Sequence, residues 1–139
     1  MIEVRPATTA DAGAIWPLTR DFATSFSPER TAFDAAFASL VERDDALLAV
    51  ASTASGAVGY VLAIAHPTLF ANAAVVWVEE LMVREADPRS GIGRQLMDAA
   101  ESWARPLGAA YVGLATRRAA DFYLALGYQE SATFFRKLL

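Results

Sequence analysis

The sequence contains no cysteine, one histidine and one lysine. Without cysteine the chain can form no disulfide, no thiolate metal site and no cysteine nucleophile. The lone His66 has no carboxylate partners at the spacing of metal ligands, so we expect no bound metal. Catalytic chemistry must therefore come from carboxylates, hydroxyls, backbone groups or His66.

Long apolar runs and an excess of basic residues are also missing. No apolar stretch approaches the roughly 18 residues of a membrane span, and no signal peptide is recognisable, so we expect a cytoplasmic protein without a membrane partner. The formal net charge is -4 at pH 7. A nucleic-acid binder needs a basic face to displace counterions from phosphates, which argues against nucleic acid as a partner. Cationic or neutral small molecules are favoured instead.

The residues that are present indicate one folded α/β domain over residues 1–139. Hydrophobic residues make up 55% of the chain and charged residues 20%, as in globular proteins. Apolar alternation predicts strands, and apolar spacing of three and four predicts helices. The expected strands are 2–5, 46–51, 58–65, 75–83, 111–115 and 132–138. The expected helices are about 12–22, 30–43, 92–105 and 118–126. This order implies a mixed sheet with helices on both faces, and an antiparallel hairpin around 53–56.

A glycine-rich loop lies between the apolar strand that ends at Val83 and the next helix. Its two glycines, Gly91 and Gly93, let the backbone approach a charged ligand, and the helix start offers unpaired N–H groups at its positive dipole end. The Rossmann fingerprint would need a third glycine where Leu96 stands, and the P-loop would need Gly-Lys-Ser/Thr. The loop is therefore a phosphate-site candidate of another kind.

Four features then follow one another in a known order: the strand 78–83 with the sequence VEELMV, the Gly-Ile-Gly loop, Phe122-Tyr123, and Gly127-Tyr128. With these motifs the chain resembles the GNAT superfamily of N-acetyltransferases, strongly from Val75 onward and earlier only through element order. The resemblance implies a single-domain, mixed, mostly antiparallel sheet with helices on both faces and splayed central strands. It also implies acetyl transfer from acetyl-CoA to a primary amine.

The resemblance further implies how acetyl-CoA is held. The pyrophosphate would bind the loop and the first turn of the helix, at Arg89, Ser90, Gly91, Ile92, Gly93 and Arg94. The pantetheine arm would pair with the backbone of Leu81, Met82 and Val83, between the splayed strands.

Two positions depart from the pattern of the family. Thr116 stands where many relatives carry asparagine, and its hydroxyl would either bond the pantetheine or cap the next helix, with capping favoured. Pro88 stands where relatives have glutamine or arginine. Proline has no N–H, so any such contact is lost or shifts to Arg89.

Two adjacent carboxylates in the apolar strand, Glu79 and Glu80, are candidate bases. An alkylamine with a pKa near about 10 is mostly ammonium at neutral pH, so a base must remove a proton. Strand alternation sends the two side chains to opposite faces, unless a β-bulge turns both inward. We favour Glu79, which matches a glutamate of polyamine-type relatives and would have its pKa raised by burial against Trp77. Glu80 is the alternative base, or a ligand for the substrate ammonium; both carboxylates could also be solvated edge charges.

Tyr123 matches the tyrosine that protonates the leaving thiolate in the family, and simple core packing is its alternative role. No motif marks the acceptor. Aromatic residues in the segments that form the acceptor wall in the family are equally compatible with core packing, namely Trp16, Phe22, Phe26 and Phe70.

A small-molecule amine is the expected acceptor. The alternatives are a protein or peptide acceptor, or a coenzyme A binding module without turnover. The apolar C-terminal strand around Phe134 and Phe135 predicts pairing with a second copy in a homodimer.

Overall fold

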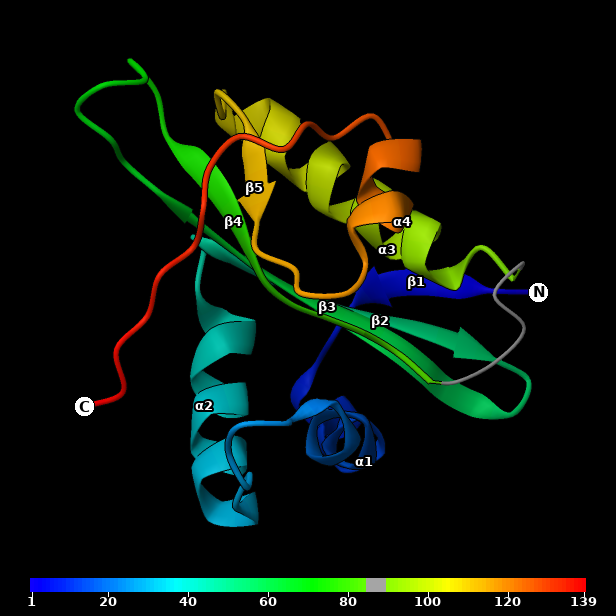
Figure 1. Ribbon diagram of the computed structural model, residues 1–139. Coiled ribbons are helices and arrows are strands. Elements are labelled where there is room, and N and C mark those ends of the chain that lie inside the picture. Colours follow the sequence, from blue (N-terminus) through cyan, green and yellow to red (C-terminus); the bar gives the residue numbers. More distant parts are fainter. Residues whose placement is uncertain (85–89) are drawn as a thin grey trace.

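The computed structural model of the protein describes residues 1–84 and 90–139, so the expectations for Pro88 and Arg89 lie outside the described residues. Its strands form a single sheet (Figure 1) and are β1 (Glu3–Pro6), β2 (Ala46–Thr53), β3 (Gly56–His66), β4 (Val75–Val83) and β5 (Val112–Leu114). Its helices are α1 (Ala12–Phe22), α2 (Arg30–Glu42), α3 (Ile92–Ala104) and α4 (Ala120–Ala125).

The strands lie in the order β1-β2-β3-β4-β5. The first four are antiparallel neighbours, whereas β5 is parallel to β4 and follows the crossover through α3. The predicted hairpin forms between β2 and β3, with Gly56 at φ 106°, a backbone conformation that favours glycine. The expected mixed, mostly antiparallel sheet is thus confirmed.

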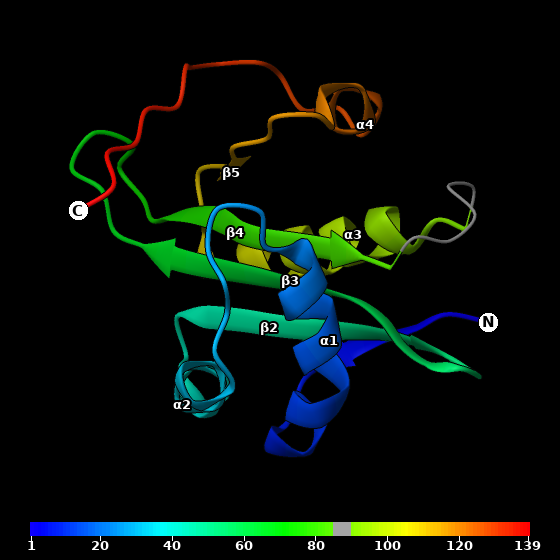
Figure 2. The ribbon, with the colours of Figure 1, turned by 60° about the horizontal axis from the view of Figure 1, so that its bottom comes forward.

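Helices cover both faces of the sheet, as predicted (Figure 2). On one face α1 and α2 pack with Ile15, Leu18 and Phe37 against even-numbered residues of the central strands. On the other face the apolar side of α3, including Leu96 and Met97, packs against the opposite side chains, and α4 adds its own apolar residues. Two separate apolar cores therefore enclose the sheet, because successive strand side chains point to opposite faces.

The start of the first helix is held by Asp11. Its carboxylate accepts hydrogen bonds from the Thr8 N–H, 2.8 Å away, and from both terminal guanidinium nitrogens of Arg5, each 2.8 Å away. Hydrogen bonding to Arg5 is the main reason that the pKa of Asp11 falls to about 2. This network joins β1 to the turn that begins α1.

The strands β4 and β5 separate halfway along β4. The ladder between β4 and β5 joins only Val76, Trp77 and Val78 to residues of β5. Beyond Val78, β4 continues to Val83 while β5 ends at Leu114. The expected splay is therefore confirmed, and one edge of β4 has no strand beside it within the described residues.

The predicted C-terminal strand over 132–138 does not form. Residues 129–139 contain no helix or strand, and Phe134 and Phe135 are exposed. The one side-chain hydrogen bond that ties this segment to the body within the described residues runs from Arg136 to the Ser25 hydroxyl, at 3.0 Å. The prediction was wrong because apolar residues of high strand propensity need a neighbouring ladder, and none accompanies them here. The two chain ends lie on opposite sides of the molecule (Figures 1 and 2).

Among the described residues no helix has the length and apolar character needed to cross a membrane.

Candidate active site

A β-bulge interrupts β4 at the two adjacent carboxylates. In the ladder with β3, Val78 lies opposite Ala63 and Glu80 lies opposite Leu62, so Glu79 is an extra residue without a partner. The bulge changes the side-chain alternation. Val76 and Val78 face α3 before it, and Leu81 and Val83 face α3 after it. Glu80 is therefore turned to the α1 and α2 side, which a regular strand would not allow.

Glu79, the extra residue, is exposed. Its pKa is raised above the ordinary value for glutamate, first by partial desolvation and then by the negative charge of Glu80, while His66 acts in the opposite direction. Glu79 and Glu80 are adjacent in β4, so the charge of each acts on the other. A carboxylate with a raised pKa is a better proton acceptor near neutral pH.

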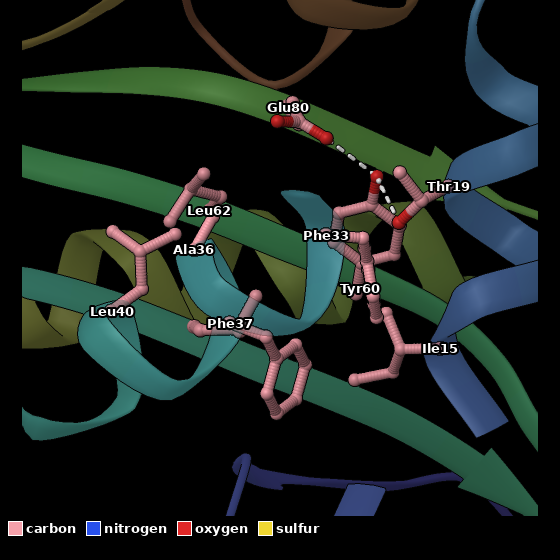
Figure 3. Close-up of a pocket in the computed structure, with 10 residues that line it drawn as sticks. Ile15, Thr19, Phe33, Ala36, Phe37, Leu40, Tyr60, Leu62 and Glu80 are labelled. Carbon is pink, nitrogen blue, oxygen red and sulfur yellow. Dashed lines mark hydrogen bonds between the residues drawn. The ribbon is translucent and has the colours of Figure 1, made fainter. Parts of the chain in front are cut away.

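Glu80 is held by hydrogen bonds that begin on the neighbouring strand. The Tyr60 hydroxyl on β3 donates to Glu80 Oε1 at 2.6 Å, and the Thr19 hydroxyl on α1 donates to the Tyr60 oxygen at 3.2 Å. Tyr60 is 2% exposed, and burial followed by the nearby Glu80 charge raises the pKa of its phenol. Tyr60 thus remains a proton donor and orients the carboxylate (Figure 3).

A cavity of about 80 Å³ lies beside this network, between α1, α2 and the sheet. Glu80, Tyr60 and Thr19 form its polar side, and the remaining lining residues are apolar (Figure 3). Those residues are Ile15, Phe33, Ala36, Phe37, Leu40, Leu48 and Leu62.

The glycine loop leads into α3 with backbone donors that have no close acceptor among the described residues. Gly91 has φ 76°, and its carbonyl accepts from the Gln95 N–H at 3.0 Å. Because that bond is the first of the helical ladder, the N–H groups of Gly93 and Arg94 have no acceptor within the helix. The Ile92 N–H has only a long contact of 3.4 Å to the Ser90 hydroxyl. Ser90 and Arg94 are exposed beside these donors.

The free edge of β4 offers backbone groups at alternate residues. The Arg84 N–H donates to the Val58 carbonyl of β3 at 2.7 Å. Alternation along an antiparallel strand then directs the N–H groups of Leu81 and Val83 to the opposite, unpaired edge. The backbone of Met82 faces β3, where its carbonyl oxygen would lie 2.7 Å from a Cβ at Gly59.

Tyr123 of α4 is half-buried on the α3 side of the sheet, and burial raises the pKa of its phenol. Its ring makes edge contacts with Phe122 and Tyr128. The Tyr128 hydroxyl donates to Glu101 Oε2 of α3 at 2.8 Å, which anchors the end of α4 to α3. No partner of the Tyr123 hydroxyl occurs in the described part of the chain.

Gly93 is the point where α3 and α4 meet. A Cβ at this position would lie 3.1 Å from Phe122 and 3.7 Å from Val83. The missing side chain therefore lets the start of α3, the end of β4 and α4 approach one another. This contact brings the glycine loop and α4, which carries Tyr123, to the same region.

The other predicted residues have local roles. The Thr116 hydroxyl accepts from the Ala119 N–H at 3.1 Å in the turn before α4, whereas the N-cap residue of α4 is Ala119, so Thr116 does not cap the helix directly. Trp16 packs edge-on against Phe33, with the Arg30 guanidinium 5.7 Å from its ring centre. Phe22, Phe26 and Phe70 are exposed. The described residues contain no cluster of three side chains suited to a metal ion.

Sequence reasoning missed Tyr60 and Thr19. Tyr60 lies in the apolar run of the expected strand 58–65, where it reads as an ordinary core residue. A buried phenol, however, usually has a hydrogen-bond partner. That requirement was the available signal. Its partner could not be read from the sequence, because Glu80 is twenty residues away and reaches Tyr60 only through the bulge.

Comparison with known proteins assigns the family. Residues 44–130, which run from just before β2 to just beyond α4, match the family described as Acetyltransferase (GNAT) domain. This match covers more than half of the chain, and the chain therefore belongs to the GNAT acetyltransferase family. It is an acetyl-CoA-dependent N-acetyltransferase with acetyl-CoA as its co-substrate. No curated protein sequence matches the chain.

Solved structures share the fold at low sequence identity. A transcriptional regulator from Bacillus halodurans C-125 has a TM-score of 0.86 and 22% identity, with 100% of each chain covered. Glucosamine-6-phosphate N-acetyltransferase from Arabidopsis thaliana has a TM-score of 0.87 and 14% identity, with 99% of this chain and 98% of the other covered. AAC(6')-Iy, solved with the bisubstrate analog CoA-S-monomethyl-acetylneamine, has a TM-score of 0.83 and 20% identity, with 100% and 99% covered.

The buried network around Tyr60 makes a prediction about stability. Tyr60→Phe removes the donor to Glu80 and the acceptor for Thr19, so we expect the free energy of unfolding to fall by about 1–2 kcal/mol. Urea denaturation measures this loss. The matched control is Tyr111→Phe. Tyr111 is 45% exposed, so removal of its hydroxyl should change the free energy of unfolding by less than about 0.5 kcal/mol. Equal stability of the two variants would contradict the network.

Proposed function

We propose that the protein transfers the acetyl group of acetyl-CoA to a primary amine of a small molecule. The observation that carries this proposal is the bulge in β4, which turns Glu80 to the cavity side and leaves Glu79 exposed beside it with a raised pKa. One carboxylate can then hold an ammonium group while the other accepts its proton. Glucosamine-6-phosphate N-acetyltransferase, one of the similar structures, has an amine acceptor of this size class by its name.

The described backbone fits acetyl-CoA, which supplies an activated acetyl thioester when bound. The free N–H groups at the start of α3 suit a pyrophosphate, and the left-handed Gly91 leads the chain to them. We assign this role to Ser90, Gly91, Ile92, Gly93 and Arg94. Leu81 and Val83 have outward backbone groups that suit the pantetheine amides, with Met82 between them. Calorimetric titration that detected no acetyl-CoA binding would contradict the assignment.

Glu79 is assigned as the base. Its carboxylate is accessible, and its raised pKa brings it closer to that of the ammonium than an ordinary glutamate would be. Glu80 is assigned to the ammonium, because Tyr60 already donates to one of its oxygens and leaves the other able to accept. An ammonium between the two carboxylates also relieves their mutual repulsion.

Tyr123 is assigned as the proton donor to the departing sulfur. Its hydroxyl is half-buried, and its raised pKa keeps the proton in place until a strong base forms nearby. The contact of Phe122 with Gly93 supports this role, since it brings α4 to the loop assigned to the coenzyme. A module that only bound coenzyme A would need neither this phenol nor the two carboxylates.

The roles of the carboxylates predict a pH profile. Glu79 must be deprotonated to accept a proton from the bound ammonium, so kcat/KM should fall as pH decreases through its raised pKa. Glu79→Gln should lower kcat by about 10²-fold to 10³-fold and remove this acid limb. The matched variant Glu80→Gln should mainly raise the amine KM and retain the limb. Loss of the limb in Glu80→Gln alone would reverse the two roles.

The role assigned to Tyr123 predicts that Tyr123→Phe lowers turnover without weakening the binding of acetyl-CoA. We expect kcat to fall by about 10²-fold, because the departing sulfur loses its proton donor while the ring packing remains. The Kd of acetyl-CoA should change by less than about twofold, as measured by calorimetry. Tyr111→Phe serves as the control with unchanged kcat. If Tyr123→Phe has the same kcat as the wild type, Tyr123 is not the proton donor and serves only in packing.

We also propose a homodimer and a cytoplasmic location. The support for the dimer is the exposed apolar side chains of Phe134, Phe135 and Leu138, in a segment that has no strand partner in its own chain within the described residues. A second copy offers such a partner through a symmetric exchange. Light scattering should give twice the chain mass, and deletion of residues 132–139 should reduce it to the monomer. A monomeric intact chain would contradict the dimer.

A further inference from the structure

We propose that the acceptor amine carries a short, branched alkyl group, which occupies the cavity between α1, α2 and the sheet while its nitrogen lies at Glu80. This inference rests on the proposed function and narrows its substrate class. The wild-type enzyme should therefore prefer small aliphatic amines to polyamines and amino sugars.

The wall of the cavity selects an apolar substituent. Ile15 is 1% exposed and Phe37 is 4% exposed, so the bottom of the cavity lies within the apolar core on this face of the sheet. The lining side chains come from α1 and α2 and from three strands, β2, β3 and β4, and Figure 3 shows the labelled ones around one space. A methyl or methylene group makes no hydrogen bonds, so its transfer from water into this cavity is favourable and leaves no polar group unpaired.

The polar side of the cavity selects one cation. Glu80 is the one charged residue among the described side chains that line it. Tyr60 and Thr19 already use their hydroxyl protons within the Thr19–Tyr60–Glu80 chain. A substrate hydroxyl or a second ammonium in the apolar part would find no partner there, and burying such a group unpaired is costly. Polyamines and sugars are disfavoured for this reason.

The size of the cavity limits the alkyl group. A cavity of about 150 Å³ can hold one benzene molecule. The cavity here is about 80 Å³, roughly half that size, which by the same scale holds about three carbon atoms. The one or two carbon atoms next to the nitrogen would lie beside Glu80, so the whole alkyl group has about three to five carbon atoms. A compact branched group fills a short cavity better than a linear chain of the same carbon number.

The first test compares amines of matched length on the wild-type enzyme. Pentylamine and putrescine have the same number of non-hydrogen atoms and differ only in a terminal methyl or ammonium group. We expect kcat/KM to be at least about 30-fold higher for pentylamine, with 3-methylbutylamine higher still. From ethylamine to 3-methylbutylamine, kcat/KM should rise up to about fourfold per carbon atom and then fall for hexylamine.

The second test fills the cavity from α2. Ala36 lines the cavity, and its neighbour Ala35 does not; both are exposed alanines in the same helix. Ala36→Leu should lower kcat/KM for 3-methylbutylamine by at least about tenfold and shift the optimum to shorter amines. Ala35→Leu is the matched control and should keep the wild-type profile. Thermal melting and the Kd of acetyl-CoA establish that both variants are folded.

The outcomes separate this inference from the proposed function. The panel also includes the amino sugar glucosamine. If acetyl-CoA binds but neither the alkylamines, putrescine nor glucosamine is acetylated, the proposed function fails, whereas acetylation of glucosamine alone overturns only the alkyl preference. If amines are acetylated with putrescine equal to or better than pentylamine, the function stands and the alkyl preference is wrong. An Ala36→Leu variant with the chain-length profile of Ala35→Leu would also overturn the cavity assignment.

Discussion

The side chains of a β-strand alternate between the two faces of a sheet, and one extra residue at Glu79 changes that alternation halfway along β4. The apolar residues on either side of the bulge keep their contact with α3. The carboxylate of Glu80, between them, is released from that core and turned to the opposite face. Without the bulge, a regular strand could not keep both sides of this segment in place. Either the charged Glu80 would enter the apolar core under α3, or Leu81 and Val83 would turn away from that core. Both arrangements are costly.

The separation of β4 from β5 depends on the same part of the strand. The parallel ladder ends at Val78, one residue before the bulge. Beyond it, one backbone edge of β4 has no strand partner in the described part of the chain, and the oriented carboxylate lies on the α1 and α2 side. Under the proposed function, this one strand segment would offer backbone groups to the co-substrate and a side chain to the acceptor. The two reactants would meet at the bulge, which is where proton transfer is needed.

Tyr60 makes this geometry stable. A carboxylate next to an apolar cavity would move toward solvent unless something held it, and the 2.6 Å hydrogen bond from a buried phenol does so. Thr19 extends the network to α1, so the position of the first helix is linked to the orientation of Glu80. The orientation of Glu80 and the packing of α1 are thus coupled through the hydroxyl groups of Thr19 and Tyr60.

Much of the fold could be predicted from local pattern. Helices 30–43 and 92–105 were predicted to within one residue of α2 and α3, and the strand 75–83 matches β4, because amphipathic periodicity is local and strong in these segments. The segment 132–138 has an equally apolar pattern, yet it forms no strand. A ladder needs a partner, and strand propensity alone does not provide one.

The candidate site divides in the same way. The sequence established the chemical groups: two adjacent carboxylates, a glycine loop before a helix, and a tyrosine in a short helix. Their residue types and spacing follow from the chain alone. The tertiary structure decided which face each carboxylate meets, and it brought Tyr60, Thr19 and the wall of the cavity to Glu80. These residues are distant in sequence, and their contact depends on strand register and on the bulge, which a single residue of offset would reverse.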